Sequence, residues 1–161
     1  MDLSRFTSSG RLPKAELARQ QAFFQANAPD FLAARYALSP GDAGGLVFDG
    51  HGEVINPCHA IACRACGSEA HRVTMHMRGI LTHCAGCDHT EVLMGEAGSG
   101  AARTCDCGAD RLSVGVRLEY PGDVFEMGVA GQESEFFSWM TLFAHCPTCE
   151  GSEVLADAES G

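Results

Sequence analysis

The sequence predicts an α+β protein in which N-terminal helices precede two small antiparallel β units. Two observations carry this prediction. Residues 83–93 and 145–155 repeat the frame His-Cys-x2-Cys-x3-Glu-Val-Leu, and six of the eleven positions are identical. Each copy is preceded by another cysteine pair with a glycine after it, Cys63-x2-Cys66-Gly67 and Cys105-x-Cys107-Gly108. Eight of the nine cysteines therefore fall into two similar sets of four.

The composition explains why such units would need help to fold. The chain has 161 residues, enough for one medium domain or two very small ones. Only 7% of the residues are aromatic and 19 are glycine, so large core side chains are scarce. Bound metal commonly supplies the missing stability in small units. We expect a helical segment over 1–40, a glycine-rich β-hairpin over 41–57, and cysteine units over 58–95 and 101–156.

The N-terminal segment carries helix signals. Pro13 suits a first turn, and strong helix formers continue over 14–27 until Pro29, whose preceding residue avoids the α region. Asp30 can cap a second helix over 31–38, which Ser39-Pro40 would end. Five large side chains are expected to pack these helices onto the rest of the protein, although docking of a partner is the alternative: Phe23, Phe24, Phe31, Leu32 and Tyr36.

The glycine-rich segment contains the only residues that suggest catalysis. Strands over 46–48 and 53–55 would flank the turn Asp-Gly-His-Gly, a strong hairpin signal. Asp49, His51 and Glu53 crowd around this turn, and Cys58 follows shortly after. An enzyme would have to use these groups. Turn chemistry already accounts for Asp49, and Cys58 and His59 would point to opposite faces of an extended chain, so we predict no enzymatic activity.

The first cysteine unit has the spacing of a metal site. Cys63-x2-Cys66 and Cys84-x2-Cys87 are separated by seventeen residues, within the range typical of four-cysteine zinc sites. Two residues between cysteines form a tight turn that directs both sulfurs at one ion. Gly67 allows a positive φ after that turn. Strand-like segments over 70–77 and 80–83 would bring the two pairs together as a hairpin. Five of the seven histidines lie in this unit, where we expect exposed positions, with His83 near the metal.

The second unit departs from the first in two ways. Its first pair, Cys105-x-Cys107, has one intervening residue, and thirty-eight residues separate it from Cys146-x2-Cys149. The shorter pair can still chelate an ion, but its turn must differ. The longer gap contains a half-buried strand over 112–118, a turn over 120–123, an alternating segment over 125–129 that suggests an added strand, and an apolar strand over 136–144.

These cysteine pairs resemble the zinc-ribbon superfamily with its rubredoxin-like turns. The resemblance covers residues 63–93 and 103–155 and implies that Cys63, Cys66, Cys84 and Cys87 bind one metal ion. By the internal repeat, Cys105, Cys107, Cys146 and Cys149 bind a second. Two zinc ions are expected, and iron is the alternative because four thiolates can also hold iron. Zinc ribbons occur in transcription factors, ribosomal proteins, enzymes and adaptors, so the resemblance transfers no function.

The distribution of charge bears on the partner. Residues 1–80 have a formal net charge of +1 and residues 81–161 one of −11. An acidic half is a poor phosphate-binding surface and suits a basic protein partner. The candidate recognition residues are Glu133, Glu135, Phe136, Phe137 and Trp139, unless the aromatics are simply core. Nucleic acid is the alternative partner, with Arg64, Arg72 and Arg78 as its only candidate contacts.

The chain lacks the signals of an exported or membrane protein. It has no apolar run near its start and no stretch of about eighteen apolar residues. We therefore expect a cytoplasmic protein, whose thiols stay reduced and bind metal rather than form disulfides. The sequence as a whole predicts a zinc-binding, non-catalytic protein that acts as a protein-interaction or regulatory module. A nucleic-acid-associated ribbon protein is the alternative.

Overall fold

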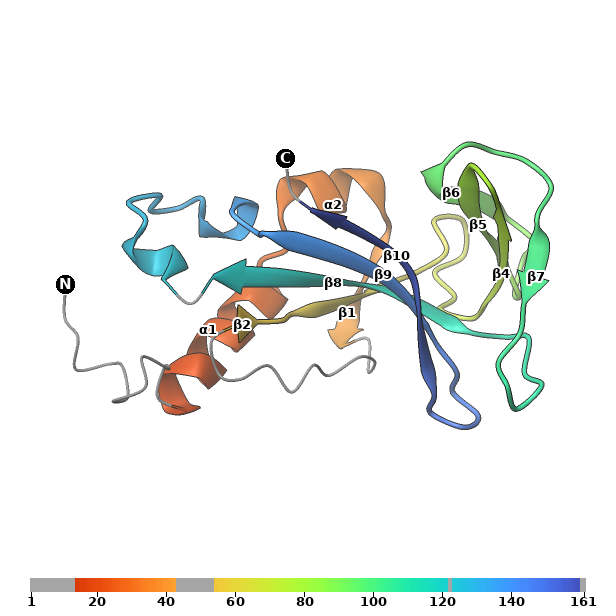
Figure 1. Ribbon diagram of the computed structural model, residues 1–161, viewed down its shortest axis with the longest axis horizontal. Coiled ribbons are helices and arrows are strands. Elements are labelled where there is room, and N and C mark those ends of the chain that lie inside the picture. Colours follow the sequence, from red (N-terminus) through yellow and green to blue (C-terminus); the bar gives the residue numbers. More distant parts are fainter. Residues whose placement is uncertain (1–13, 43–53, 122, 160–161) are drawn as a thin grey trace.

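The computed structural model describes residues 14–42, 54–121 and 123–159 (Figure 1). Two helices, α1 (Lys14–Ala26) and α2 (Asp30–Arg35), precede two antiparallel sheets. The larger sheet has the order β1-β3-β8-β9-β10, and β2 also pairs with β8. Its strands are β1 (Leu38–Asp42), β2 (Val54–Ile55), β3 (Cys58–Ile61), β8 (Ser113–Pro121), β9 (Trp139–His145) and β10 (Ser152–Glu159). The smaller sheet has the order β6-β5-β4-β7 and contains β4 (His71–His76), β5 (Gly79–Cys84), β6 (Thr90–Gly95) and β7 (Ala101–Arg103).

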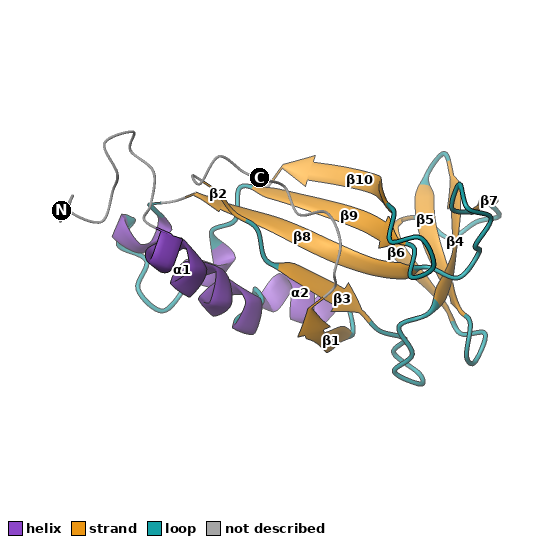
Figure 2. Cartoon of the chain, turned by 90° about the horizontal axis from the view of Figure 1, so that it is seen from below, coloured by secondary structure: helices purple, strands orange, loops and turns teal. Residues whose placement is uncertain are grey.

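The smaller sheet is an insertion between two neighbouring strands of the larger one. Strands β3 and β8 pair with each other, and Ile61 lies opposite Val114 at the end of their ladder. The chain leaves the larger sheet through residues 62–70, forms β4 to β7, and returns through residues 104–112. The strands of the smaller sheet run across the direction of β8 and β9 (Figures 1 and 2). Residues 62–70 and 104–112, the first and second crossing segments, therefore determine how one sheet is attached to the other.

The main core lies between the larger sheet and the helices on one of its faces (Figure 2). Alternate residues of β8 form its floor: Val114, Val116 and Leu118 are almost fully buried, as the sequence predicted, and so is Tyr120, which was expected in a turn but belongs to the strand. The ring of Phe24 stacks on that of Tyr120 at 3.8 Å between centroids. Burying a side chain of this size stabilises a fold by about 2–3 kcal/mol. The apolar face of α1 is thereby fixed against the end of β8.

Two glutamines of α1 bind the backbone of the short connection between β2 and β3 at the edge of the larger sheet. The side chain of Gln21 accepts from the N–H of Asn56 (3.0 Å) and donates to its carbonyl (2.9 Å). Gln25 does the same for Cys58. Pro57 lies between Asn56 and Cys58 and has no N–H to donate. Both glutamine side chains thus satisfy edge groups that a neighbouring strand would otherwise satisfy.

The strand pairing differs from the division into two separate ribbons. Cys58–Ile61, expected in the first unit, pairs with β8, and Ala101–Arg103, expected in the second unit, pairs with β4. The long-range pairing of β3 with β8 interleaves the two units, and spacing alone does not reveal it. The second helix also ends earlier than expected, because Tyr36 is extended (φ −123°) and Leu38 begins β1. The predicted strands over 46–48 and 53–55 fall largely outside the described residues.

The predicted extra strand over 125–129 is wrong. A short 3-10 helix, Val124–Glu126, occupies its start. This turn lets two consecutive side chains pack inward: Val124 is fully buried, and the ring of Phe125 lies 5.4 Å from that of Phe23 on α1. A strand would have sent them to opposite faces. A second 3-10 helix, Glu133–Glu135, precedes β9.

Candidate metal centres

The first cysteine cluster joins the outgoing crossing segment to a hairpin of the smaller sheet. Cys63 and Cys66 lie in the crossing segment, Cys84 ends β5, and Cys87 lies in the turn before β6. The sulfurs of Cys63 and Cys87 are 3.6 Å apart, and those of Cys66 and Cys84 are 3.5 Å apart. All four sulfurs lie within 4.8 Å of one another.

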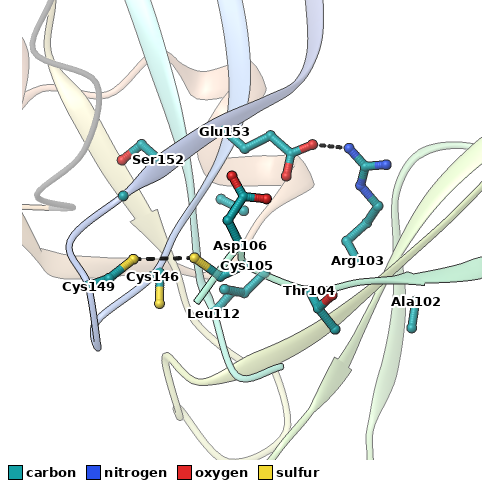
Figure 3. Close-up of a pocket in the computed structure, with 12 residues that line it drawn as sticks. Ala102, Arg103, Thr104, Cys105, Asp106, Leu112, Cys146, Cys149, Ser152 and Glu153 are labelled. Carbon is teal, nitrogen blue, oxygen red and sulfur yellow. Dashed lines mark hydrogen bonds and ion pairs between the residues drawn. The ribbon is translucent and has the colours of Figure 1, made fainter. Parts of the chain in front are cut away.

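The second cluster joins the returning crossing segment to a hairpin of the larger sheet. Cys105 and Cys107 lie in the crossing segment, and Cys146 and Cys149 lie in the turn between β9 and β10 (Figure 3). The sulfurs of Cys105 and Cys149 are 3.3 Å apart, and those of Cys107 and Cys146 are 3.7 Å apart. The structure thus groups the eight predicted cysteines into the two predicted sets. Cys58 belongs to neither.

These sulfur separations fit a tetrahedral metal site. Four sulfurs at about 2.3 Å from one ion are about 3.8 Å from one another. A disulfide would require a separation of about 2.05 Å, and all nine cysteines are free. Each set therefore has the ligand number, ligand type and spacing that a zinc ion or an iron ion requires. These are closed sets, since protein sulfurs occupy all four positions.

Backbone hydrogen bonds explain why each cysteine pair forms this turn. In the Cys63 turn, the first cysteine donates its N–H to the Ser68 carbonyl, and its own carbonyl accepts from the Gly67 N–H, both at 2.8 Å. The turns that begin at Cys84 and Cys146 repeat this pattern at the same offsets. In the turn at Cys105 the partners are Gly108 and Ala109, one residue closer. The Cys-x-Cys pair is therefore the same turn with one residue removed.

The residue that closes each turn has a left-handed backbone. Gly67 and Gly108 have φ angles of 78° and 92°, which glycine adopts without strain. Asp88 and Glu150 occupy the equivalent positions in the two hairpin turns, both with φ 63°. A non-glycine residue adopts this conformation at a cost. The two hairpin turns therefore hold strained residues beside the clustered cysteines.

Hydrogen bonds to sulfur favour the thiolate form of one cysteine in each cluster. Burial raises the pKa of the Cys84 thiol, but the backbone N–H groups of Gly86 and Cys87 donate to its sulfur and lower the pKa to about 6. Donation from the N–H groups of Cys149 and Thr148 likewise outweighs burial and lowers the pKa of Cys146 to about 6. Metal binding requires thiolates, so these two residues are prepared to act as ligands.

The repeated sequence is also a structural repeat. His83 and Thr90 face each other across the first hairpin, with Nδ1 and Oγ1 3.1 Å apart. His145 and Ser152 face each other across the second, with Nδ1 and Oγ 2.9 Å apart. Each histidine thus contacts a hydroxyl on the opposite strand, directly next to the cysteine turn that joins the two strands. The other ring nitrogen of His83, Nε2, lies 3.1 Å from the Thr74 hydroxyl, and its place near a metal stays a prediction.

The Glu-Val-Leu part of the repeat has equivalent roles as well. Glu91 forms an ion pair with Arg64 (3.6 Å), and Glu153 forms one with Arg103. Each glutamate thus holds an arginine in or next to the crossing segment whose cysteines belong to the same cluster. The strand register shifts at Leu93 in one hairpin and at Leu155 in the other, and both leucines are buried. A bulge at this point turns the leucine toward the core.

A buried histidine joins the two sheets between the clusters. His71 and Leu112 exchange backbone hydrogen bonds of 2.8 Å, and the His71 ring donates from Nε2 to the Ile61 carbonyl at 3.0 Å. His71 is 2% exposed and His59 is 4% exposed, so the expectation of surface positions is wrong for these two. The Arg103–Glu153 ion pair spans the junction beside the second cluster and lines a cavity of about 560 Å³ (Figure 3).

The candidate partner residues divide into two groups. Glu135, Phe136 and Phe137 line a groove of about 690 Å³, whereas Glu133 and Trp139 do not line it. Glu133 accepts from the Gly131 N–H in its own loop, and Trp139 pairs with Glu119 and Glu159 on neighbouring strands. Phe31 and Met127 also line the groove, and no sequence pattern associates them with it, because they come from α2 and from the loop between β8 and β9.

Other sequence candidates have less support from the geometry. The three arginines considered for nucleic acid each lie within 4 Å of a carboxylate, in the pairs Arg64–Glu91, Arg72–Asp110 and Arg78–Glu96. Asp49, His51 and Glu53 lie outside the described residues. The thiol of Cys58 lies 3.9 Å from the Asn56 carbonyl. No described helix is long and apolar enough to cross a membrane.

His71, Arg103 and Glu153 form the junction between the sheets, and the sequence identified none of them as such. The repeat marked Glu153 but not its partner, and the buried position of His71 depends on the pairing of distant strands. Comparisons with models of protein families, with curated proteins and with solved structures found no match for this chain. Function is therefore inferred from the sites themselves.

Proposed function

We propose that the chain is a zinc-binding protein with two structural sites and that it acts as a non-catalytic protein-interaction or regulatory module. The observation that carries this proposal is the pair of closed four-sulfur clusters. Protein ligands fill all four positions of each set, so neither ion would retain an open position to activate water or substrate. Zinc is the metal that such sites most commonly hold, and iron is the alternative.

The location of the clusters supports a structural role. Each links one crossing segment to one hairpin turn, so the two ions would fasten the smaller sheet to the larger one from both sides of the junction. The free energy of metal binding then contributes directly to folding. Short hairpins with few large apolar side chains need such a contribution. The ions would thereby fix the relative placement of the surfaces that both sheets present.

The charge distribution supports an interaction role. No lysine or arginine follows Arg117, whereas nine carboxylates do. A basic protein would be attracted to this half of the chain, and a nucleic acid would be repelled. A nucleic acid would also have to displace carboxylates from Arg64, Arg72 and Arg78. We therefore retain the protein partner as the proposal.

Metal analysis and affinity capture test the two parts of this proposal. Protein purified under reducing conditions should contain two zinc ions per chain by mass spectrometry of metals, and a red, iron-containing sample would overturn the choice of metal. The zinc-loaded chain should retain specific proteins from a lysate of its native host. An unrelated protein of similar net charge serves as the control for nonspecific electrostatic capture. Retention of the same set by both would contradict a specific interaction role.

A further inference from the structure

Strand β10 is an edge of the larger sheet. Seven of its eight residues pair with β9 on one side, all but Leu155 at the bulge, and within the described part of the chain no strand pairs with the other side. Backbone N–H and C=O groups along such an edge can accept an added strand. Glu153, Asp157 and Glu159 lie along β10; Glu153 is ion-paired with Arg103, and Asp157 accepts a hydrogen bond from the Thr141 hydroxyl (3.0 Å). Their like charges oppose pairing between two copies of this strand and favour pairing with a cationic strand.

An apolar groove adjoins the C-terminal end of this edge. Ala158 and Glu159 of β10 form part of its lining, with Met140 of β9 nearly buried beside them. Three large apolar side chains in the lining remain exposed: Phe31 (47%), Met127 (46%) and Phe136 (37%). They come from a helix and from two separate parts of the loop between β8 and β9. A groove of about 690 Å³ can accept one large side chain of a partner.

The rim of the groove is acidic. Glu135 and Glu159 are its charged lining residues, and it has no basic one. The nearest basic residue on α2, Arg35, donates to the Tyr36 hydroxyl and the Leu93 carbonyl, and so is held toward the smaller sheet. Glu135 also accepts from the N–H of Asp30, which fixes its carboxylate at the start of α2. The groove and the strand edge thus present one continuous apolar and anionic surface.

We propose that β10 and the adjoining groove bind a basic, extended segment of a partner protein. The segment pairs with β10 as an additional antiparallel or parallel strand and inserts one large apolar side chain into the groove. Its lysine or arginine side chains face Asp157 and Glu159 of β10 and Glu135 at the rim of the groove. Alternate side chains of a strand point the same way, so a segment that alternates basic and apolar residues fits both features. This inference rests on the proposed interaction function and specifies its partner.

Labelled peptides and the zinc-loaded full chain test this site by fluorescence anisotropy. The first probe is a ten-residue peptide that alternates lysine and valine around a central leucine; the second has glutamate in place of lysine. Only the lysine peptide should bind, and its affinity should fall as salt rises from 50 to 300 mM. Phe136→Ala should weaken binding at least about tenfold. Glu159→Lys should weaken it severalfold.

Matched variants control for general effects of size and charge. Met77→Ala removes an exposed apolar side chain in the β4–β5 turn, and Glu69→Lys makes the same charge change in a crossing segment; both should leave the affinity within about twofold. Equal weakening by these controls would overturn the site. So would binding of the glutamate peptide, or failure of the lysine peptide to bind.

Backbone methylation of the peptide tests strand addition itself. Methyl groups on the alternate amides that face β10 should abolish binding, whereas methyl groups on the intervening amides should not. Hydrogen exchange should show new protection at alternate residues of β10. Equal effects of both methylated peptides, or a dimer of the chain that Phe136→Ala abolishes, would overturn the proposal. A captured host protein that binds Phe136→Ala and Glu159→Lys as well as wild type would leave the interaction function standing and exclude this site.

Discussion

His71 and Leu112 exchange two backbone hydrogen bonds of 2.8 Å at the point where the chain passes between its sheets. His71 begins β4 directly after the first crossing segment, and Leu112 ends the second crossing segment directly before β8. Each crossing segment carries one of the two cysteine pairs of a cluster. The first cluster lies on the side of the smaller sheet and the second on the side of the larger. An ion bound at either cluster would therefore hold a crossing segment on which both sheets depend.

Removal of both metals should unfold residues 58–155 as one unit. Without the ions, the crossing segments retain few apolar contacts to hold them, and the bridge at His71 cannot offset the conformational entropy of two long connections. Circular dichroism during titration with a strong chelator should show a single transition that excess zinc reverses. Retention of most strand structure in excess chelator would contradict a structural role for the metals.

Single cysteine substitutions should remove one ion at a time. Cys84→Ser and Cys146→Ser each replace a ligand whose pKa is lowered to about 6, and each should leave one zinc per chain in native mass spectrometry. Hydrogen exchange should rise first in β4–β6 for Cys84→Ser and in β9–β10 for Cys146→Ser. Cys58→Ser is the matched control and should retain two ions; loss of an ion from this variant would mean that the ligand sets are assigned wrongly.

Local patterns in the sequence predict local structure here, but not the relation between the sheets. Cysteine spacing predicted the first set of four cysteines, the internal repeat predicted the second, and alternation predicted β8, because turn geometry and side-chain periodicity depend on neighbouring residues alone. The pairing of β3 with β8 and the contact of His71 with Leu112 join residues that are more than forty positions apart. The burial of His71 also depends on the path of a crossing segment, which no local pattern predicts. The groove likewise collects Phe31, Met127 and Phe136 from elements whose approach no local pattern specifies.

Relief of backbone strain at the hairpin turns should stabilise the protein. Glu150 has a φ of 63°, so Glu150→Gly should raise the free energy of unfolding by about 0.5–1 kcal/mol, measured by denaturation in excess zinc. Gly67→Ala should lower it by about 1 kcal/mol, although a Cβ at this position would have no atom within 4 Å. Strain is then the only cause. Gly86→Ala, without a positive φ, is the control, and an equal loss there would contradict this explanation.

Gly115 should prove essential for the packing of β8 against β9. A Cβ at this position would lie 2.6 Å from the ring of Phe143, its register partner on β9, and 3.1 Å from the carbonyl oxygen of His59. Phe143 is 1% exposed and so has little room to move. Gly115→Ala should therefore lower the free energy of unfolding by about 1–3 kcal/mol.

A second substitution distinguishes this clash from a general intolerance of alanine. Phe143→Leu removes the ring atoms that a new Cβ would meet, at the cost of a smaller core side chain. In the double variant, Gly115→Ala should cost less than it does in the wild type, and thermal denaturation in excess zinc measures both differences. The contact with the His59 carbonyl remains in either background, so the recovery should be partial. Strictly additive losses would show that the ring of Phe143 does not restrict residue 115, and the close approach of the two strands would then need another explanation.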